Sequence, residues 1–332
     1  MLFVESSTHL RFAIGESTIP ETTIQFRILA ERYGVPELAN LSNFQSLRSR
    51  VSAACGVKRN FSFAYHRPGE AHRGAETTQF PTWAPPFGPD VHYYRQDVDA
   101  YMLTVAIRDG AVVRQQLRIS QLDIDDRGVR LVSAEGEEFF ARFVVDAGGV
   151  QAPVAHRLGL RTDPCPLRTR SRTIYTHMIG VLPYDRCGPS QGEHRMPSPL
   201  SQGTLHHLFP GGWIWVIPFD NHPASTSRLC SVGLTLDLTD APAAPADPET
   251  EFRTRIAAMP SVARQFADAR AVRSWTGTGR LQYSSVRTAG ARYALLPHAA
   301  AFVDPLFSSG LSVTMNLANV LISRILGALA DD

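Results

Sequence analysis

The spacing of hydrophobic and polar residues predicts short strands and helices from the start of the chain. The first residues, MLFVES, form an apolar run that ends in Glu5, which is typical of a strand with an acidic residue at its carboxyl end. In the segment ETTIQFRILAERYG the apolar residues recur at helical spacing. Pro20 suits the first turn of that helix and Gly34 suits its end. The pattern therefore predicts a strand followed by a helix.

A second helix and a hairpin are predicted after residue 91. RQDVDAYMLTVAI has a helical period, and two alternating stretches then meet at a turn of Asp126, Arg127 and Gly128. The apolar run RFVVDAGG follows and places Asp146 before a glycine pair. Ligands of open α/β sheets bind at such strand ends, so this segment is a candidate binding element.

The segment from 166 to 285 is rich in strands and prolines. GTLHHLF and WIWVIPF predict a hairpin around PGG, RLCSVGLTLDL predicts a further strand, and EFRTRIAAM predicts a short helix. In WIWVIPF, alternation puts Trp213, Trp215 and Ile217 on one face of the strand. Such a face could wall a site, and it is equally common in the core of a sandwich.

The segment FVDPLFSSGLS, over residues 302–312, places an aspartate, a proline and a turn of small residues before a long apolar helix. Backbone amides at such a turn point towards a bound anion. The following residues, 311–330, are long enough to span a membrane. Because Ser312, Asn316 and other polar residues interrupt them, they predict a buried helix of a large domain instead.

Length and composition narrow the function classes. A chain of 332 residues suggests about two domains or one large α/β domain, and the net charge of +2 favours no nucleic-acid partner. Arg168, Arg170 and Arg172 alternate as on a solvated strand face. The 4 cysteines and 11 histidines form no CxxC or HExxH spacing, so no metal site is predicted. No leader pattern is visible, which predicts a cytoplasmic protein without a membrane partner.

One residue type is almost absent. Lys58 is the only lysine among 33 lysine and arginine residues. A lysine can lose its proton when it is desolvated, and can then act as a nucleophile or as a tunable donor, whereas an arginine cannot. Chance survival of one codon is the competing explanation.

Two motifs carry a resemblance to a known family. WIWVIP fits a WxWxIP motif, and Phe302, Pro305, Ser308 and Gly310 fit FxxPxxSxG. RFAIGESTIP and VVDAGG are similar to two further segments. From residue 1 to about 325 the chain thus resembles the flavin-dependent halogenases. The resemblance implies an α/β, glutathione-reductase-like FAD-binding fold of the aromatic hydroxylase type, with a β-rich substrate subdomain.

The resemblance also implies a reaction. FAD, reduced by a separate flavin reductase, reacts with oxygen to give a hydroperoxide, and a halide ion attacks this to give hypohalous acid. The acid moves through a tunnel to Lys58, which presents it to an electron-rich aromatic carbon as a hydrogen-bonded acid or as a haloamine. The aromatic substrate is either free or tethered to a carrier protein.

The resemblance assigns further site residues. Ser309 and Gly310 resemble the halide site, although a plain turn explains them equally well. Trp213, Trp215 and Pro218 resemble the wall of the tunnel. Arg95 approaches the cofactor or forms a surface ion pair. The complete set that the resemblance places at the cofactor is Glu5, Gly15, Glu16, Arg95, Asp146, Asp304 and Pro305.

The chain departs from the family pattern in two ways. Phe307 occupies the position where tryptophan halogenases carry a glutamate, which favours a more activated phenol, pyrrole or substituted indole as the substrate. GxGxxG does not occur in the chain. The first βα unit is therefore expected to be missing and the chain to be truncated at both ends, which would weaken FAD binding.

The expected domains are an incomplete FAD-binding domain and a β-rich substrate and tunnel domain. The first comprises residues 1–54, 91–165 and 286–332, and the second comprises 55–90 and 166–285. Two other functions fit the same sequence. One is an FAD-dependent monooxygenase or reductase of the same fold, and the other is an inactive, truncated remnant.

Overall fold

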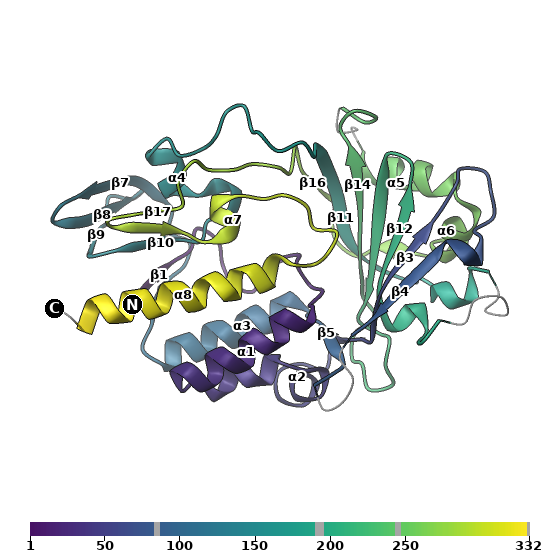
Figure 1. The fold of residues 1–332 in the computed structure, drawn as a ribbon, viewed down its shortest axis with the longest axis horizontal. Helices are drawn as coiled ribbons and strands as arrows, with labels where there is room; N and C mark the ends of the chain where they lie inside the picture. Colours follow the sequence, from purple (N-terminus) through teal and green to yellow (C-terminus); the bar gives the residue numbers. More distant parts are fainter. Residues whose placement is uncertain (83–86, 190–195, 243–246, 331–332) are drawn as a thin grey trace. The chain divides into compact units, whose positions relative to one another are not determined.

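The computed structural model describes residues 1–82, 87–189, 196–242 and 247–330, which form two compact units (Figure 1). Unit 1 comprises Met1–Ile14, Arg95–Arg168 and Gln282–Asp332, and unit 2 comprises Gly15–Tyr94 and Thr169–Leu281. The sequence-based division placed residues 15–54 with the cofactor domain, whereas their contacts place them in unit 2. The assignment of one unit to cofactor and the other to substrate stays a prediction.

Unit 1 contains small sheets with parallel pairs. β1 runs parallel to β6, β10 runs parallel to β18, and β7, β8 and β9 form an antiparallel meander. The predicted strand before Glu5, the turn at Asp126 and the strand that ends at Asp146 are confirmed. The strands of unit 1 are β1 (Leu2–Val4), β6 (Val112–Arg114), β7 (Ile119–Asp125), β8 (Gly128–Ser133), β9 (Glu138–Ala141), β10 (Val144–Asp146), β17 (Ala289–Gly290) and β18 (Tyr293–Leu295).

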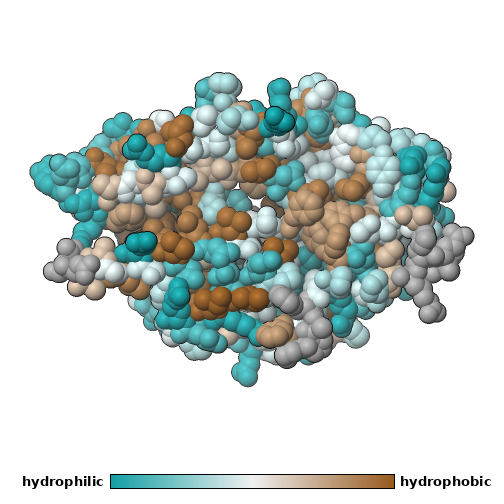
Figure 2. All heavy atoms as spheres, viewed as in Figure 1, coloured by the Kyte–Doolittle hydropathy of each residue, from teal (hydrophilic) through white to brown (hydrophobic). Residues whose placement is uncertain are grey.

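The last helix of unit 1 differs from its prediction. Of the residues in α8, only Ser312 is buried, while Val320 is 57% and Leu326 is 51% exposed. The prediction of a buried core helix is therefore wrong for this structure. Exposed hydrophobic residues appear as brown spheres in Figure 2. The helices of unit 1 are α3 (Arg95–Arg108), η3 (Gly149–Gln151), α4 (Pro153–Arg157), α7 (Pro297–Ala300) and α8 (Gly310–Ala330).

Within the described parts of the chain, α8 is the one helix with the length and apolar composition of a membrane span. Core helices of soluble proteins also meet this criterion.

Unit 2 is built on an 8-stranded sheet with the order β15-β11-β14-β13-β12-β3-β4, and β16 pairs with β11. The predicted hairpin is β12–β13, and β3 joins β12 in parallel. The strands of this sheet are β3 (Asn60–Tyr65), β4 (Thr77–Pro81), β11 (Ser171–Ile179), β12 (Gly203–Phe209), β13 (Gly212–Pro218), β14 (Cys230–Asp237), β15 (Arg270–Ala271) and β16 (Thr276–Gly277).

One face of the sheet packs on helices. Ile214, Val216 and Leu234 are buried there in one cluster with Phe252 of α5 and Phe266, which follows α6. Figure 1 shows α5 and α6 on one side of these strands. Because side chains alternate along a strand, Trp213 and Trp215 lie on the opposite face, as the sequence predicted. The remaining helices of unit 2 are α1 (Pro20–Tyr33), η1 (Pro36–Leu41), α2 (Phe44–Arg50), η2 (Gly74–Glu76), η4 (Tyr184–Arg186), η5 (Leu200–Gln202), α5 (Pro248–Ala257) and α6 (Pro260–Gln265).

The other face of the sheet is aromatic. Register places Phe63 opposite His206, His206 opposite Trp215, and both Trp215 and Tyr175 opposite Gly233. These residues come from neighbouring strands and share one side. We call this surface the aromatic face, and its members are Phe61, Phe63, Tyr175, His206, Trp213 and Trp215.

Arg172 corrects a second prediction. Its side chain is buried and donates to both carboxylate oxygens of Glu251 in α5, at 2.5 and 2.8 Å, and to Ala241 O. The three alternating arginines therefore do not form one solvated face. A buried arginine with a bidentate carboxylate partner fastens β11 to α5.

The segment around Lys58 is held by a small separate sheet. β2 (Gly56–Lys58) pairs antiparallel with β5 (Asp90–His92), so that Lys58 lies opposite Asp90. Ser17 forms an isolated bridge with His92. After Ser17, α1 begins with Pro20 in its first turn. The helix is capped by Gly34, which has a φ of 65°. Both predicted boundaries are therefore confirmed. This arrangement brings three distant segments together at Lys58.

Candidate active site

Lys58 is completely buried in unit 2. Its Nζ donates to Ser17 Oγ at 2.8 Å and to Thr18 O at 2.5 Å, and lies 4.5 Å from the centre of the Phe61 ring. Burial lowers the pKa of Lys58 to about 7, against the opposing effect of Asp90. The single lysine is thus an amine that can lose its proton near neutral pH, beside the first ring of the aromatic face.

Asp90 is the acidic partner across the small sheet. It is buried, and Thr23 Oγ1 donates to its Oδ1 at 3.3 Å. Burial raises the pKa of Asp90, while the positive charge of Lys58 acts in the opposite direction. Each of the two buried groups therefore affects the pKa of the other.

Hydrogen bonds connect Lys58 to the end of the WIWVIP strand. Ser17 Oγ lies 2.7 Å from Thr204 Oγ1. Thr204 Oγ1 lies 2.9 Å from His92 Nε2, and His92 Nδ1 lies 2.9 Å from Pro218 O. Burial lowers the pKa of His92 to about 3, and the charge of Lys58 acts in the same direction, so His92 is neutral at ordinary pH. No spacing of residues in the sequence indicates this connection.

Gly56 lets β2 approach Pro218. A Cβ on Gly56 would lie 2.2 Å from Pro218 O and 3.0 Å from His92 Nδ1. Asn221 fixes the next residue, because its Oδ1 accepts from Val57 N and its Nδ2 donates to Val57 O, both at 2.8 Å. Close backbone packing, which only glycine permits at this point, thus sets the position of Lys58.

The aromatic rings continue from Lys58 towards the tryptophans. Ring centres are separated by 4.8 Å between Phe61 and His206, by 5.4 Å between His206 and Trp213, and by 5.8 Å between Trp213 and Trp215. Trp215 Nε1 donates to a serine hydroxyl of β14 at 3.2 Å. The structure therefore brings together Lys58, the tryptophan pair and Pro218 in unit 2. Their role as the wall of a tunnel stays a prediction.

We expect Gly233→Ala to displace Trp215. A Cβ on Gly233 would lie 2.1 Å from Cζ2 and Cη2 of Trp215, so the buried indole ring would have to move. Overpacking of this kind costs about 1–3 kcal/mol. Denaturant unfolding, followed by tryptophan fluorescence, measures this cost.

Gly277→Ala is the matched control on the same sheet, because the nearest atom to its Cβ is Ile174 Cγ2 at 3.8 Å. We expect a change in its unfolding free energy within about 0.5 kcal/mol. An equal change in the free energy of unfolding from the two substitutions would contradict the close contact between Gly233 and Trp215.

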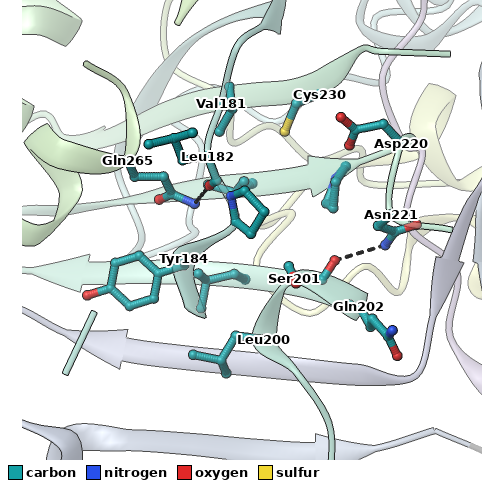
Figure 3. A pocket seen from close by; sticks show the side chains of 15 residues that line it. Val181, Leu182, Tyr184, Leu200, Ser201, Gln202, Asp220, Asn221, Cys230 and Gln265 are labelled. Carbon is teal, nitrogen blue, oxygen red and sulfur yellow. Dashed lines mark hydrogen bonds between the residues drawn. The ribbon is translucent and has the colours of Figure 1, made fainter. Parts of the chain in front are cut away.

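A cavity of about 160 Å³ lies in unit 2, and Pro218 and Asn221 are among the residues that line it. Figure 3 shows Gln265 bonded to the Leu182 carbonyl and Asn221 bonded to the Ser201 carbonyl at its border. Leu205, Val216 and Cys230, which line it, come from the helix-packed side of the sheet. None of the members of the aromatic face lines this cavity.

Unit 1 contains the predicted halide residues at the start of α8. Ser309 directly precedes Gly310, the first residue of the helix, and the first amides of a helix lack partners within it. Ser308 adopts a left-handed φ of 53, and a Cβ on Gly310 would lie 2.8 Å from His298 Nε2. His298 was not predicted as a neighbour. The turn is compatible with an anion, and halide binding stays a prediction.

Asp304 and Glu5 are two further predicted cofactor residues, and their cofactor roles stay predictions. Asp304 Oδ1 accepts from Leu306 N at 2.7 Å, and burial raises the pKa of Asp304. Pro305 closes the same turn by accepting from Ser308 N. Glu5 follows the parallel strand β1, and its Oε1 accepts from Ser7 N and Ser7 Oγ, both at 3.0 Å.

Two other predicted cofactor residues have structural contacts that explain them without a cofactor. Both carboxylate oxygens of Asp146 accept backbone hydrogen bonds, from Gly148 N at 2.8 Å and Val154 N at 2.9 Å. Arg95 donates to Asp99 within α3 and to Ile14 O at 2.8 Å. Their predicted cofactor roles stay untested.

Glu16 and Gly15 belong to unit 2. Glu16 is buried, and its Oε1 lies 2.7 Å from His177 Nε2 on β11. Gly15 has a φ of 88, which explains why glycine occupies this position. Among the described residues no group of three or more His, Cys, Asp and Glu side chains could hold a metal ion.

Comparison with solved structures identifies the fold. The structure of halogenase PltM in complex with phloroglucinol and FAD aligns with a TM-score of 0.93 at 36% identity, over 99% of this chain and 65% of that chain. The fold is therefore that of the FAD-dependent halogenases, as the motifs implied. Within it, unit 2 carries the buried lysine and the aromatic face.

Sequence comparison gives the family. A family model described as tryptophan halogenase matches residues 75–332, and the chain belongs to this family. Monodechloroaminopyrrolnitrin halogenase PrnC of Pseudomonas fluorescens is 46% identical over 332 residues, which are 100% of this chain and 58% of that protein. Tetracycline 7-halogenase of Kitasatospora aureofaciens is 45% identical over 335 residues, which are 100% of this chain and 60% of that protein. The chain thus spans less than two thirds of these curated relatives.

Proposed function

We propose that this chain is part of an FAD-dependent halogenase that acts on an electron-rich aromatic ring. One observation carries the proposal: the only lysine of the chain is buried at the edge of an aromatic face that contains both tryptophans of WIWVIP. The halogenase names of the relatives support the same reaction class. Phe307, in place of an acidic residue, favours a phenol, pyrrole or substituted indole over tryptophan.

The proposed cofactor is FAD, reduced by a separate flavin reductase. Glu5 and Asp304 would hold it, and the amides around Ser309 and Gly310 would hold the halide ion. When bound, the reduced flavin would supply, together with oxygen, the oxidising equivalent that converts the halide ion to hypohalous acid. A cytoplasmic location, and a substrate that is either free or bound to a carrier protein, belong to the same proposal.

Lys58 would hold and orient the halogenating species. As an ammonium it can donate a proton to the oxygen of hypohalous acid, which makes the halogen more electrophilic. As a neutral amine it can attack the halogen of hypohalous acid, which forms the Nζ–halogen bond, breaks the oxygen–halogen bond and releases water. A pKa near 7 keeps both forms available, whereas a guanidinium would remain fully charged. Trp213 and Trp215 would exclude water and hold the aromatic ring by stacking.

The test is a reaction of the purified protein with reduced FAD, oxygen, bromide and an activated phenol. We expect a brominated product by mass spectrometry, and no halogenated product when bromide is omitted. A hydroxylated ring in the presence of bromide would contradict halogenation and favour a monooxygenase. Absence of any product, from protein shown by flavin fluorescence to bind FAD, would also contradict the proposal.

A further inference from the structure

The hydrogen-bond chain from Lys58 to Pro218 has a fixed direction. The Pro218 carbonyl can only accept, so His92 Nδ1 carries a hydrogen and donates it over 2.9 Å. Since the low pKa of His92 keeps the ring neutral, its Nε2 is an acceptor. Thr204 Oγ1 must therefore donate its only hydrogen to His92 Nε2.

The direction of the hydrogen bonds is fixed as far as the lysine. Once the Thr204 hydroxyl donates to His92, its oxygen faces Ser17 as an acceptor, and Ser17 Oγ donates to it over 2.7 Å. The Ser17 oxygen then faces Lys58 only as an acceptor. The second partner of Nζ, the carbonyl of Thr18, is also an acceptor. Lys58 is thus surrounded by two groups that can only receive its hydrogens.

We propose that His92 is a positioning residue that acts through Thr204 and Ser17 to orient the amine of Lys58. Two N–H groups of Lys58 are held by Ser17 and Thr18, and the third position on Nζ faces the Phe61 ring at the edge of the aromatic face. That position carries a hydrogen in the ammonium and the lone pair in the neutral amine. The catalytic use of this orientation rests on the proposed function. The hydrogen-bond chain that orients the amine does not depend on that function.

Three titratable groups bear on Lys58. Asp90 and His92 lie on β5, and His206 lies on β12. Burial lowers the pKa of both histidines, to about 3 in each case, and the charge of Lys58 acts in the same direction. Both rings therefore stay neutral while Lys58 titrates, and Asp90 is the acidic group that favours its charged form.

The direction of the chain predicts the effect of breaking it. In Thr204→Val the Ser17 hydroxyl loses its acceptor and can turn to donate to the lone pair of Lys58. Hydrogen bonding to the neutral form favours that form, so the pKa of Lys58 should fall. A hydrogen bond of ordinary net strength corresponds to a fall of about one pKa unit. Thr204→Ser keeps the hydroxyl and should restore the wild-type value.

NMR of protein grown with lysine labelled with ¹³C at Cε measures this pKa, and a single lysine gives a single resonance. The control is Thr235→Val, which removes another buried, hydrogen-bonded hydroxyl of the same sheet, one that contacts Thr173 at 3.2 Å. We expect a lower midpoint in Thr204→Val only. An unchanged midpoint in Thr204→Val, or an equal fall in Thr235→Val, would overturn the inference.

The measurement needs neither cofactor nor substrate, so it separates this inference from the proposed function. A selective fall in the midpoint supports the hydrogen-bond chain even in a protein that does not halogenate. Conversely, halogenation by a protein whose Lys58 midpoint does not respond to Thr204→Val would support the function and refute the role of His92.

Discussion

Lys58→Met is expected to reduce the rate of bromination at least about 100-fold, which is the lower end of what a positioned proton donor or nucleophile contributes. Methionine has a similar length and no charge, so it can occupy the buried space over Phe61. It can neither donate a proton to hypohalous acid nor accept a halogen at an amine. Product formation with reduced FAD, oxygen, bromide and an activated phenol measures the effect.

Arg59→Met is the matched control, because Arg59 is the adjacent cationic residue and is exposed. We expect nearly wild-type bromination from it. Thermal unfolding of each variant shows whether the fold is retained. A wild-type rate of bromination from folded Lys58→Met protein would contradict a catalytic role for the lysine.

Gly56→Ala is expected to have the second largest effect, because it moves the strand that carries Lys58. Its Cβ would meet the backbone oxygen of Pro218 at 2.2 Å, and a backbone atom cannot rotate away. The overpacking should cost about 1–3 kcal/mol in the free energy of unfolding. Displacement of β2 should also lengthen the contacts of Lys58 with Ser17 and Thr18, so bromination should fall with stability.

Gly279→Ala serves as the comparison, since a Cβ there meets nothing within 4 Å. Urea unfolding of both variants, with the bromination assay beside it, gives the two readouts. A Gly56→Ala protein as stable and active as Gly279→Ala would mean that the contact between β2 and Pro218 does not position the lysine.

The spacing of residues in the sequence predicted those elements that depend on interactions between residues close together in the chain. Alternation in WIWVIP gave the two faces of β13, and Pro20 and Gly34 marked the ends of α1 because they act within one helical turn. The order of the two motifs gave the fold, because those residues occur together in a known family. These predictions needed no knowledge of distant contacts.

Long-range partners could not be predicted in this way. Ser17 and Lys58 are 41 residues apart, and His92 and Thr204 are 112 apart, so no spacing in the sequence connects them. Arg172 was expected in solvent because it alternates with Arg168 and Arg170, and its partner Glu251, 79 residues away, could not be inferred from that pattern. The apolar composition of α8 indicated a buried helix, but burial depends on what packs against it, and composition does not show that.

The proposed chemistry requires that Lys58 is a buried amine which exchanges its proton near neutral pH. Titration of the ¹³Cε resonance of Lys58 in the wild-type protein tests this most directly. We predict a midpoint near pH 7. A midpoint near 10.4, the value of a lysine in water, would contradict the buried site and the chemistry proposed for it.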